Sequence, residues 1–572
     1  MYDELRTAWG ELTAPGAPFE VGEVEVRGIR MRAFTHAPAT LRDLWLGSRA
    51  HGEADYLVYE GERWSYDRAH QQVGSIGAWL VSQGVAPGDR VAIAMRNYPE
   101  WLLVYWATVS VGAVAVGMNA WWTSEEMRFA LCDSEPKVLV CDDERLQRLQ
   151  AVRSEVPCEQ VVAVRCETTL PADTIPFDAL LTGGALPDHD ADTDADACLF
   201  YTSGTTGNPK GARLTHRSCT NNLFSMAFWG AAQTRARKLA RTREAPAAKS
   251  AMTRSTPPPQ ACSLLTTPLF HVTANNCGAH SATAGGGKLV LMYKWDAAKA
   301  LRLIEEERVT TFGGVPTMAR ELLAHPDLAK TDTSSLALIG GGGAKFQSDL
   351  VHKVEGRKGR TRPNTGYGLT ETSGIITANS ADFLVDKAES VGPVMPCFEA
   401  QCVDDDGRVV AAGQPGELWV KGAQVVAGYW NRPEATAEAI TEGWFHTGDI
   451  AVIDEDGFVE IVDRKKDMVL RGGENVYCSE VESALFDHPD VAECAVFGVP
   501  DERLGEEVGA AIRLRAGSTA DAQGLRAHCG DRIAKHKVPR YVWLLDEALP
   551  RNANGKFVKR DLRERLDPAD AS

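Results

Sequence analysis

Two periods alternate in the hydrophobic pattern of this chain. Between residues 71 and 83 the apolar residues Val73, Ile76 and Leu80 recur at helical spacing, and after an Ala-Pro-Gly-Asp turn the run VAIAM occupies 91–95. The first pattern predicts an amphipathic helix and the second a buried strand. A helix followed by a buried strand is therefore the first unit that the pattern predicts.

Similar units recur before residue 444. A second apolar helix is expected from Trp101 to about Val111. Strand-like runs follow at KVLVC (137), QVVAV (160), KLVLM (288) and LALIG (336), with helical stretches between them. Buried strands that alternate with helices predict α/β layers around largely parallel sheets.

The pattern changes after Trp444. The stretch GWFHTGDIAVIDEDGFVEIVDRKKDMVLRGGENV alternates short strands with frequent turns. Beyond it, AECAVFGV and EVGAAIRL have the pattern of strands and residues 525–535 that of a helix, so a small α+β unit is expected. The highly charged stretch 463–466 is the expected boundary, which gives domains 1–465 and 466–572.

Residues 232–260 interrupt the α/β rhythm. They combine three consecutive prolines with a single acidic residue, Glu244. The basic residues of this segment are Arg235, Arg237, Lys238, Arg241, Arg243, Lys249 and Arg254. A basic, Pro-rich segment without periodicity predicts a solvated surface insertion. Attraction to an anionic surface or to ligand phosphates is the alternative, and the sequence leaves it open.

Composition narrows the class of protein. A chain of 572 residues exceeds one compact core, so two or more domains are expected. The 61 Lys and Arg against 78 Asp and Glu give a net charge of -17, which argues against nucleic-acid binding. The acidic N-terminus does not resemble a secretory signal, and no run approaches the roughly 20 apolar residues of a transmembrane helix.

The cysteines indicate the compartment. The chain has 13 of them, scattered, without a CxxC pair or a Cys/His cluster. This distribution argues against a zinc site and against a disulfide framework. A cytoplasmic enzyme with reduced thiols is therefore expected, and a homodimer is left open.

The stretch YTSGTTGNPKGARLTH, which begins at residue 201, carries the first candidate chemistry. Its glycines let the backbone approach a ligand, its hydroxyls can donate hydrogen bonds, and its lysine adds charge. Such a loop can wrap phosphate oxygens, although it lacks the GK[ST] ending of the common nucleotide loop. The candidate phosphate-binding residues are Thr202, Ser203, Gly204, Thr205, Thr206, Gly207 and Lys210.

This loop resembles the signature loop of the adenylate-forming superfamily, which includes acyl-CoA synthetases, aryl-CoA ligases, luciferases and the adenylation domains of peptide synthetases. Later stretches resemble further motifs of the family in the family's order: NTGYGLTET (364–372), GELWVKG (416–422), GWFHTGD (443–449), DRKKDMVLRGGENVYCSEVE (463–482) and PRNANGKFVKR (550–560). The resemblance extends from about Leu41 to Leu566. It implies an α/β fold, with a large N-terminal domain of α/β layers, a small β-barrel-like subdomain and a small, mobile α+β C-terminal domain.

The resemblance also implies an enzyme, an AMP-forming acyl-CoA synthetase. In the family a carboxylate attacks the α-phosphate of ATP to give an acyl-adenylate and pyrophosphate. A thiol, usually that of coenzyme A, then displaces AMP. ATP, Mg²⁺ and coenzyme A are the implied cofactors, and a small-molecule carboxylic acid is the implied partner.

The motifs assign the first half-reaction to specific residues. Lys556 resembles the catalytic lysine that bridges the carboxylate and the α-phosphate. Glu371 matches the magnesium-binding glutamate, and Thr370 is suited to an α-phosphate oxygen. Tyr367 offers a flat ring for the adenine, and Asp449 matches the acid that accepts both ribose hydroxyls. The remaining nucleotide contacts implied by the motifs are Gly341, Gly342, Gly366, Gly368 and Arg464.

The second half-reaction implies movement of the C-terminal domain. Lys466 stands at the position of the family's hinge, two residues after the arginine of the DR motif. Gly472 and Gly473 match the loop that lines the pantetheine tunnel. Cys478 stands where a proline or serine is common, and we expect it to be a small buried filler.

The acid pocket is less well defined by the motifs. His271, in PLFHVT, is expected beside the substrate carboxylate or closing the pocket, and a structural histidine is the alternative. Val315, Gly342 and Gly366 are the other expected pocket residues. LFHVTANN lacks the aspartate of amino-acid-activating relatives, so the acid is expected to be uncharged apart from its carboxylate.

A departure from the family leaves part of this pocket open. In IGGGGAKFQ, Lys345 and Phe346 replace an expected proline and leucine, which puts the pocket assignments at that loop in doubt. Medium- or long-chain fatty, aryl and steroid-type acids all remain as substrates. An acyl-AMP ligase that loads a carrier protein and a non-catalytic nucleotide-binding relative are the alternative functions.

Overall fold

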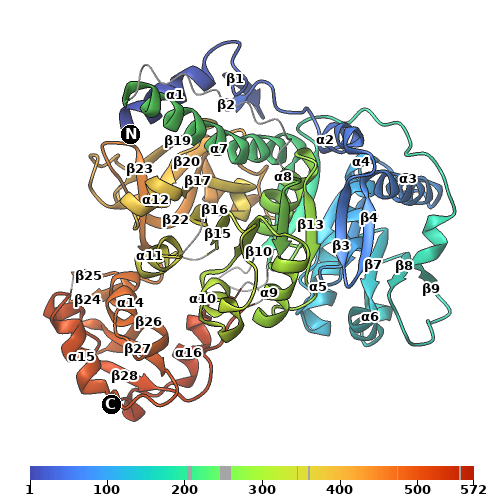
Figure 1. The fold of residues 1–572 in the computed structure, drawn as a ribbon. Helices are drawn as coiled ribbons and strands as arrows, with labels where there is room; N and C mark the ends of the chain where they lie inside the picture. The colour runs from blue at the N-terminus through green and yellow to red at the C-terminus, as the bar shows by residue number, and fades with distance from the viewer. Residues whose placement is uncertain (203–208, 245–258, 344–345, 358–360, 473, 553–554) are drawn as a thin grey trace.

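The computed structural model describes residues 1–572 except 203–208, 245–258, 344–345, 358–360, 473 and 553–554. The strands up to β23 belong to one large body, and those from β24 onward form a smaller body beside it (Figure 1). The large body contains two mainly parallel sheets and one antiparallel sheet. The α/β fold expected from the sequence is confirmed.

The first mainly parallel sheet has seven strands in the order β11-β10-β6-β5-β7-β8-β9, and only the β10–β11 pair is antiparallel. The run VAIAM forms its central strand, where apolar residues are buried on both faces. The strands are β5 (Arg90–Ala94), β6 (Val114–Gly117), β7 (Val138–Asp142), β8 (Gln160–Val164), β9 (Thr174–Pro176), β10 (Asp196–Thr202) and β11 (Lys210–Thr215).

The second sheet has eight strands in the order β17-β16-β15-β14-β12-β13-β3-β4, with antiparallel pairs only at its two ends. Its strands are β3 (Asp55–Tyr59), β4 (Glu62–Ser65), β12 (Cys262–Leu265), β13 (Lys288–Leu291), β14 (Thr311–Gly314), β15 (Leu338–Gly341), β16 (Arg362–Leu369) and β17 (Gly374–Ser380).

The third sheet is antiparallel and takes the place of the expected barrel-like subdomain. Its order is β18-β23-β22-β20-β19, with β21 paired to β22. Its strands are β18 (Gly392–Pro393), β19 (Phe398–Val403), β20 (Gly416–Gly422), β21 (Ile440–Thr441), β22 (Trp444–Ile453) and β23 (Phe458–Arg464). A separate hairpin joins β1 (Val21–Val26) to β2 (Ile29–Phe34).

The smaller body has its own five-stranded sheet in the order β25-β24-β27-β26, with β28 parallel to β27. The two strands expected at AECAVFGV and EVGAAIRL form its long central hairpin. The strands are β24 (Val469–Arg471), β25 (Glu474–Val476), β26 (Val491–Asp501), β27 (Gly505–Leu514) and β28 (Tyr541–Leu544).

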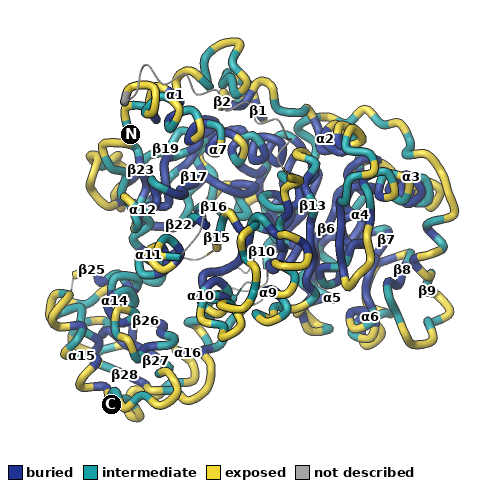
Figure 2. Tube along the Cα trace, viewed as in Figure 1, coloured by how far each residue is buried: buried dark blue, intermediate teal, exposed yellow. Residues whose placement is uncertain are grey.

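Helices cover the sheets and leave the strands as the buried layer (Figure 2). The helices of the large body are α1 (Tyr2–Thr13), α2 (Leu41–Gly47), α3 (Tyr66–Ser82), α4 (Pro99–Ser110), α5 (Ser124–Ser134), α6 (Asp143–Gln150), α7 (His216–Glu244), α8 (His280–Ala284), α9 (Ala297–Glu306), α10 (Pro316–Ala324), α11 (Ser348–Glu355), α12 (Ala381–Asp386) and α13 (Pro433–Ala439). Those of the smaller body are α14 (Cys478–Phe486), α15 (Ala522–Gly530) and α16 (Lys559–Arg565). None of the described helices combines the length and the apolar character that a membrane span requires.

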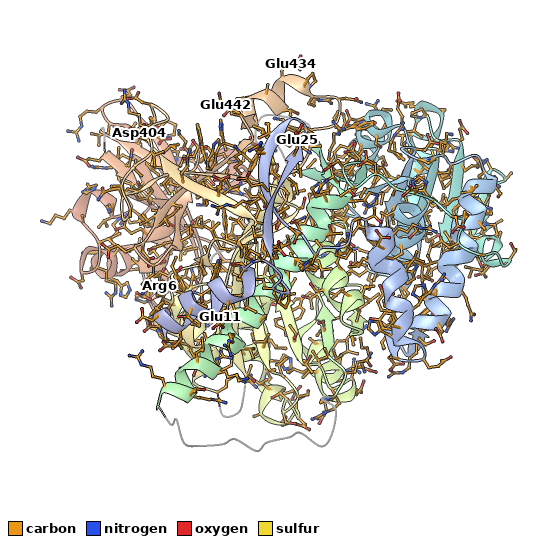
Figure 3. All side chains as sticks on the ribbon, turned by 90° about the horizontal axis from the view of Figure 1, so that it is seen from above. Arg6, Glu11, Glu25, Asp404, Glu434 and Glu442 are labelled. Carbon is orange, nitrogen blue, oxygen red and sulfur yellow. The ribbon has the colours of Figure 1, made fainter. Side chains whose placement is uncertain are left out.

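The prediction of a solvated insertion at 232–260 is wrong for its first part. Residues 232–244 continue α7, and Ala232 and Ala236 are fully buried. The N-terminal helix α1 lies beside this part of α7, as the view of Arg6 and Glu11 in Figure 3 shows. Two of the basic residues pair with that helix, through Arg235–Glu11 (2.6 Å) and Arg243–Glu4 (3.0 Å).

Local periodicity failed in this segment because its buried positions, such as Ala232 and Ala236, hold small residues with basic residues between them. The buried face is narrow, and the basic residues beside it are neutralised by acids that are distant in sequence, such as Asp382, which pairs with Arg237 at 3.1 Å. Residues 245–258, which hold the prolines, lie outside the described part of the chain.

Candidate active site

The motif NTGYGLTET lies at one end of the eight-stranded sheet. Strand β16 ends at Leu369 and passes directly into η6 (Thr370–Thr372), a single 3₁₀ turn that carries Thr370 and Glu371. Ser373 follows at φ 55°, in the left-handed region that few residues other than glycine adopt. The chain therefore turns sharply at the two predicted site residues before it continues as β17.

The glycines expected to contact nucleotide also let strands approach each other. A β-carbon at Gly341 would collide with the Gly314 carbonyl oxygen, and one at Gly368 with the backbone of β17. The sheet itself therefore requires these two glycines. Gly342 and Gly366 border each other, because a β-carbon at Gly342 would lie 3.3 Å from the Gly366 carbonyl oxygen.

Glu371 is half-buried, and among the described residues its carboxylate has one side-chain hydrogen-bond partner, a hydroxyl group. Tyr429 Oη donates to Glu371 Oε1 at 2.9 Å. Burial raises the pKa of Glu371 above its ordinary value, and the Tyr429 hydrogen bond and the Arg464 charge oppose this rise. No salt bridge to Glu371 occurs among the described residues. A hard oxygen donor set of this kind suits a divalent cation such as Mg²⁺.

Asp449 is buried between two of the other predicted residues. It lies on β22, directly opposite Arg464 on β23. Tyr367 Oη donates to Asp449 Oδ2 at 2.6 Å, and Arg464 Nε lies 3.3 Å from Oδ1. Each carboxylate oxygen keeps a second lone pair, so the group can still accept further hydrogen bonds. Tyr367 is therefore held by its hydroxyl, with its ring fixed beside the carboxylate.

Lys556 comes from the smaller body and reaches the same region. Its Cε would lie 3.7 Å from a β-carbon at Gly343. Burial, and after it the charge of Arg464, lowers the pKa of Lys556 to about 8, while Asp449 and Glu371 oppose this shift. The predicted catalytic lysine and the two predicted carboxylates are thus brought together, although they lie far apart in the sequence.

The loop that carries Lys556 docks through a glycine. Gly555 has φ +74°, and a β-carbon there would lie 3.0 Å from Val315 Cγ2. The Lys556 backbone N–H donates to Asn552 Oδ1 at 3.0 Å, which closes the turn from within. Val315, expected to line the acid pocket, therefore contacts the smaller body where α16 approaches α10 (Figure 1).

His271 lies close enough to Lys556 for the charge of the lysine to affect the protonation of the imidazole. Burial and the Lys556 charge lower the pKa of His271 to about 3, so the imidazole is neutral near pH 7. Its Nε2 is buried and has no hydrogen-bond partner among the described residues. An unpartnered buried ring nitrogen is costly, which favours a role toward a ligand over a purely structural one.

The phosphate loop connects β10 to β11. Thr202 ends β10, and Lys210 begins β11. The Lys210 ammonium lies 5.3 Å from the centre of the Tyr429 ring, whose hydroxyl binds Glu371. The other predicted loop residues lie outside the described part of the chain: Ser203, Gly204, Thr205, Thr206 and Gly207.

The residues predicted for the second half-reaction are not all brought to this site. Gly472, at φ +61°, lies in the β24–β25 hairpin, on the far side of the smaller body from α16 (Figure 1). Gly473 lies outside the described residues. Lys466 lies near Arg464, between the third sheet and the smaller body, where partial burial and the Arg464 charge lower its pKa.

Two sequence departures have structural explanations. Phe346 is buried among apolar residues beneath the eight-stranded sheet, such as Ile339 and Leu350. Lys345 lies outside the described residues. Cys478 is fully buried at the start of α14, where its thiol donates to the Asp467 carbonyl oxygen at 3.0 Å, as expected of a buried filler.

Tyr429 is the site residue that sequence reasoning missed. The run AGYWNRP at 427–433 contains two large aromatic residues beside a glycine, a weak signal in the sequence. Gly428 has φ +130°, and a β-carbon there would collide with Thr436. A glycine that fixes the backbone immediately before an aromatic residue could have drawn attention to this position.

Comparison with known proteins identifies the family. The AMP-binding enzyme family matches residues 46–430, and the AMP-binding enzyme C-terminal domain matches residues 480–556. The chain belongs to the AMP-binding enzyme family. The predicted membership in the adenylate-forming, acyl-CoA synthetase-like superfamily is confirmed.

The similarity to two acyl-CoA-forming relatives extends over most of the length of each relative. Feruloyl-CoA synthase of Amycolatopsis sp is 35% identical over 540 residues, which cover 92% of this chain and 100% of the relative. The mitochondrial medium-chain acyl-CoA ligase of Mus musculus is 31% identical over 548 residues, which cover 90% of this chain and 85% of the relative.

A solved structure agrees with the sequence relatives. ATP-bound MatB from Rhodopseudomonas palustris superposes with a TM-score of 0.76 at 29% identity, covering 91% of this chain and 98% of MatB. This member of the AMP-binding enzyme family is thus an AMP-forming acid–CoA ligase with acyl-CoA synthetase activity, and ATP, Mg²⁺ and coenzyme A are its cofactors, as predicted.

We expect the formation of acyl-adenylate to fall as the pH rises through about 8, the pKa of Lys556 in the ligand-free enzyme. Only the protonated amine can stabilise the negative charge at the α-phosphate, and the protonated fraction decreases above this pH. The measurement is kcat/KM for pyrophosphate release against pH, which reports groups of the free enzyme. Thioester formation from supplied acyl-adenylate serves as the control, and an equal fall there would remove Lys556 as the cause.

Gly555→Ala should impair the first half-reaction by displacing Lys556. The added methyl group would contact Val315 and strain a residue at φ +74°. A misplacement of about 1 Å can cost about 100-fold in rate, so pyrophosphate release should fall by that order. Thioester formation from supplied acyl-adenylate should change little.

Gly517→Ala is the matched control for this substitution. Gly517 lies in the smaller body at φ +84°, with nothing within 4 Å of its added β-carbon. The control therefore introduces the same backbone strain without the contact. If both variants lost pyrophosphate release equally, the Val315 contact would not be the reason.

Proposed function

We propose that this enzyme activates an uncharged carboxylic acid as its acyl-adenylate, with release of pyrophosphate. It then transfers the acyl group to coenzyme A, with release of AMP. The observation that carries the proposal is the approach of Lys556 to Asp449, Glu371 and Arg464 across two separately folded bodies. A lysine delivered to the site by a second body can act in one half-reaction and be withdrawn in the other.

The electrostatics support an anionic ligand between the two bodies. Lys556 and Lys466 both have pKa values lowered by burial and by the positive charge of Arg464. Three cations held this close repel one another unless an anion lies between them. We propose that the phosphates of ATP supply this anion, that Lys556 contacts the α-phosphate, and that Lys210 holds the leaving pyrophosphate.

The nucleoside is assigned to the pocket around Asp449. We propose that its carboxylate accepts the ribose hydroxyls and that the Tyr367 ring flanks the adenine, with Gly366 and Gly342 leaving room for the base. Arg464 serves as a ribose or phosphate contact. The hydrogen bond from Tyr367 to Asp449 supports this assignment, since it fixes ring and carboxylate relative to each other.

Glu371 and Thr370 fit a magnesium ion. The Glu371 carboxylate has one oxygen held by Tyr429, and the Thr370 hydroxyl lies on the same turn. We propose that Glu371 is the protein ligand of Mg²⁺ and that Thr370 contacts an α-phosphate oxygen. The ion would neutralise phosphate charge when it is bound.

The acid is assigned to the space beside His271 and Val315. The neutral imidazole, the valine and the glycines around Gly342 add no charge that would favour a charged acyl group. Relatives named for a feruloyl and for a medium-chain acyl substrate support an aryl or fatty acid. We propose this substrate class, with coenzyme A rather than a carrier protein as the acceptor.

We propose that residues 1–465 and 466–572 are the two moving units. Strand β23 ends at Arg464 and β24 begins at Val469 in another sheet, so Lys466 lies where no strand pairing restrains the chain. Rotation about Lys466 would withdraw Lys556 and bring the hairpin at Gly472 and Gly473 toward the acyl-adenylate. All 13 cysteines are free thiols, which supports our further proposal of a cytoplasmic location.

The decisive experiment supplies purified enzyme with ATP, Mg²⁺, coenzyme A and a panel of cinnamic, benzoic, medium-chain, long-chain and steroid-type acids. We expect stoichiometric pyrophosphate, AMP and acyl-CoA from at least one aryl or fatty acid. Mass spectrometry of the thioester provides the measurement. Pyrophosphate release without any acyl-CoA would instead favour an acyl-AMP ligase that loads a carrier protein.

Lys466→Pro tests the hinge separately. Proline fixes φ near −65°, so the chain should be unable to absorb the backbone change of a rotation. Because Lys556 already lies close to Asp449 and Glu371, pyrophosphate release in the first turnover should be largely retained, while acyl-CoA formation from supplied acyl-adenylate should fall by about 100-fold. Lys465→Ala, at the neighbouring residue, is the control. An unchanged overall rate in Lys466→Pro would place the hinge elsewhere.

A further inference from the structure

Residues 424–430, here called the bridging segment, connect the strand after the phosphate loop to the turn that carries Glu371. The segment runs antiparallel beside β11 and forms an isolated β-bridge with it between Tyr429 and Ala212. Its backbone hydrogen bonds with β11 are Ala427 N–H to Arg213 O (2.9 Å), Arg213 N–H to Gly428 O (2.9 Å) and Trp430 N–H to Gly211 O (2.8 Å). One end of the bridging segment is therefore fixed to the seven-stranded sheet.

The other end of the bridging segment holds η6, at the edge of the eight-stranded sheet. The Val426 backbone N–H donates to the Glu371 carbonyl oxygen at 3.0 Å. Gln424 Nε2 donates to the Thr372 carbonyl oxygen at 2.9 Å. Two consecutive carbonyl groups of the turn thus accept hydrogen bonds from the segment, which restrains its backbone.

Gln424 is itself fixed by a buried polar network. It is fully buried, and its Oε1 accepts a hydrogen bond from Ser225 Oγ at 3.0 Å. Asn222, also fully buried, accepts from the Ile375 backbone N–H at 3.0 Å, just beyond the turn. A buried network that is satisfied in this way permits little backbone movement, because each broken bond would leave a polar group unpaired.

Tyr429 adds a contact to the side chain of Glu371. Its hydroxyl donates to Oε1 at 2.9 Å, while its ring faces the Lys210 ammonium at 5.3 Å. One tyrosine therefore touches both the candidate metal ligand and the lysine at the base of the phosphate loop. The hydrogen bond occupies one carboxylate oxygen, and within the described part of the chain no side-chain group hydrogen-bonds to Oε2.

We propose that Tyr429 is a positioning residue for the metal site, and that the bridging segment fixes Glu371 relative to β11, the strand that begins with Lys210. The Val426 backbone N–H and the Gln424 side-chain amide hold the turn, and the Tyr429 hydroxyl holds one oxygen of the carboxylate. This inference rests on the proposed role of Glu371 as the magnesium ligand.

The physical reason is that a carboxylate on a flexible side chain binds a metal weakly unless its orientation is fixed. Glu371 has three side-chain torsions, and among the described residues the Tyr429 hydroxyl is the one side-chain group that hydrogen-bonds to its carboxylate. Partners that orient a metal ligand typically change metal affinity by about 10- to 100-fold when removed. The hydroxyl of Tyr429 should therefore matter to the metal far more than to the acid or to coenzyme A.

Tyr429→Phe tests this inference, because it removes the hydroxyl and keeps the ring that faces Lys210. We expect the dissociation constant of Mn²⁺, measured by EPR in the presence of a non-hydrolysable ATP analogue, to rise by about 10-fold. The Mg²⁺ concentration for half-maximal pyrophosphate release should rise in parallel. The KM of the acid, and thioester formation from supplied acyl-adenylate, should stay unchanged.

Tyr2→Phe is the matched control. Tyr2, on the N-terminal helix α1, also donates a hydrogen bond to a carboxylate: its Oη lies 2.5 Å from Asp386 Oδ2 on α12. The Tyr2→Phe substitution removes the same kind of hydrogen bond outside the site, so the Mn²⁺ affinity of this variant should equal that of the unmodified enzyme. Equal weakening in both variants, or unchanged Mn²⁺ affinity in Tyr429→Phe, would overturn the inference.

Glu371→Gln separates this inference from the function on which it rests. If Glu371→Gln weakens Mn²⁺ binding and Tyr429→Phe does not, Glu371 is the ligand and Tyr429 does not position it. If neither variant alters Mn²⁺ binding, the metal role of Glu371 itself fails, and the inference fails with it. Weakening in both, with the larger effect in Glu371→Gln, is the result we expect.

Discussion

The site depends on holding positive charges close together at the junction of two bodies. Lys556, Arg464 and Lys466 lie near enough to influence one another, and burial adds to the cost of each charge. The negative charges of Asp449 and Glu371 compensate in part. Burial also disfavours these charges, because it raises the pKa values of both carboxyl groups. In the proposed reaction the phosphates of ATP relieve this repulsion, so nucleotide binding would favour the closed arrangement. Loss of pyrophosphate would weaken that preference, which gives rotation a physical cause.

The two sides of the junction differ in how firmly they are held. The turn that carries Glu371 is bound through its backbone to the bridging segment and through it to a fully buried polar network. Lys556 instead lies on a short turn closed by local bonds with Asn552, and the turn approaches the large body where Gly555 meets Val315. In the proposed two-step reaction, Glu371 would stay in place as the metal ligand while Lys556 is withdrawn.

The basic residues at 232–244 have a structural role that the composition of the segment did not predict. They lie on the exposed flank of α7 and pair with acids of the N-terminal helix and of α12. The buried flank of the same helix packs Phe228 and Trp229 into an aromatic cluster with Trp9 and Phe34. The first forty or so residues of the chain therefore cover this helix, beyond the 46–430 range of the family match.

The sequence by itself determined the fold class, the order of the motifs and the chemical type of each site residue. Strand and helix periods are local, so the runs at VAIAM and LALIG could be assigned without tertiary information. The motif resemblance then named Lys556, Glu371, Asp449 and Arg464, and all four meet in the structure.

Tertiary structure alone decided which of these groups touch. The Tyr429–Glu371 and Tyr367–Asp449 hydrogen bonds join residues distant in sequence, and the basic residues of the helix at 232–244 find acidic partners on α1 and α12. Such contacts depend on how sheets and helices pack, and packing leaves no period in a single sequence.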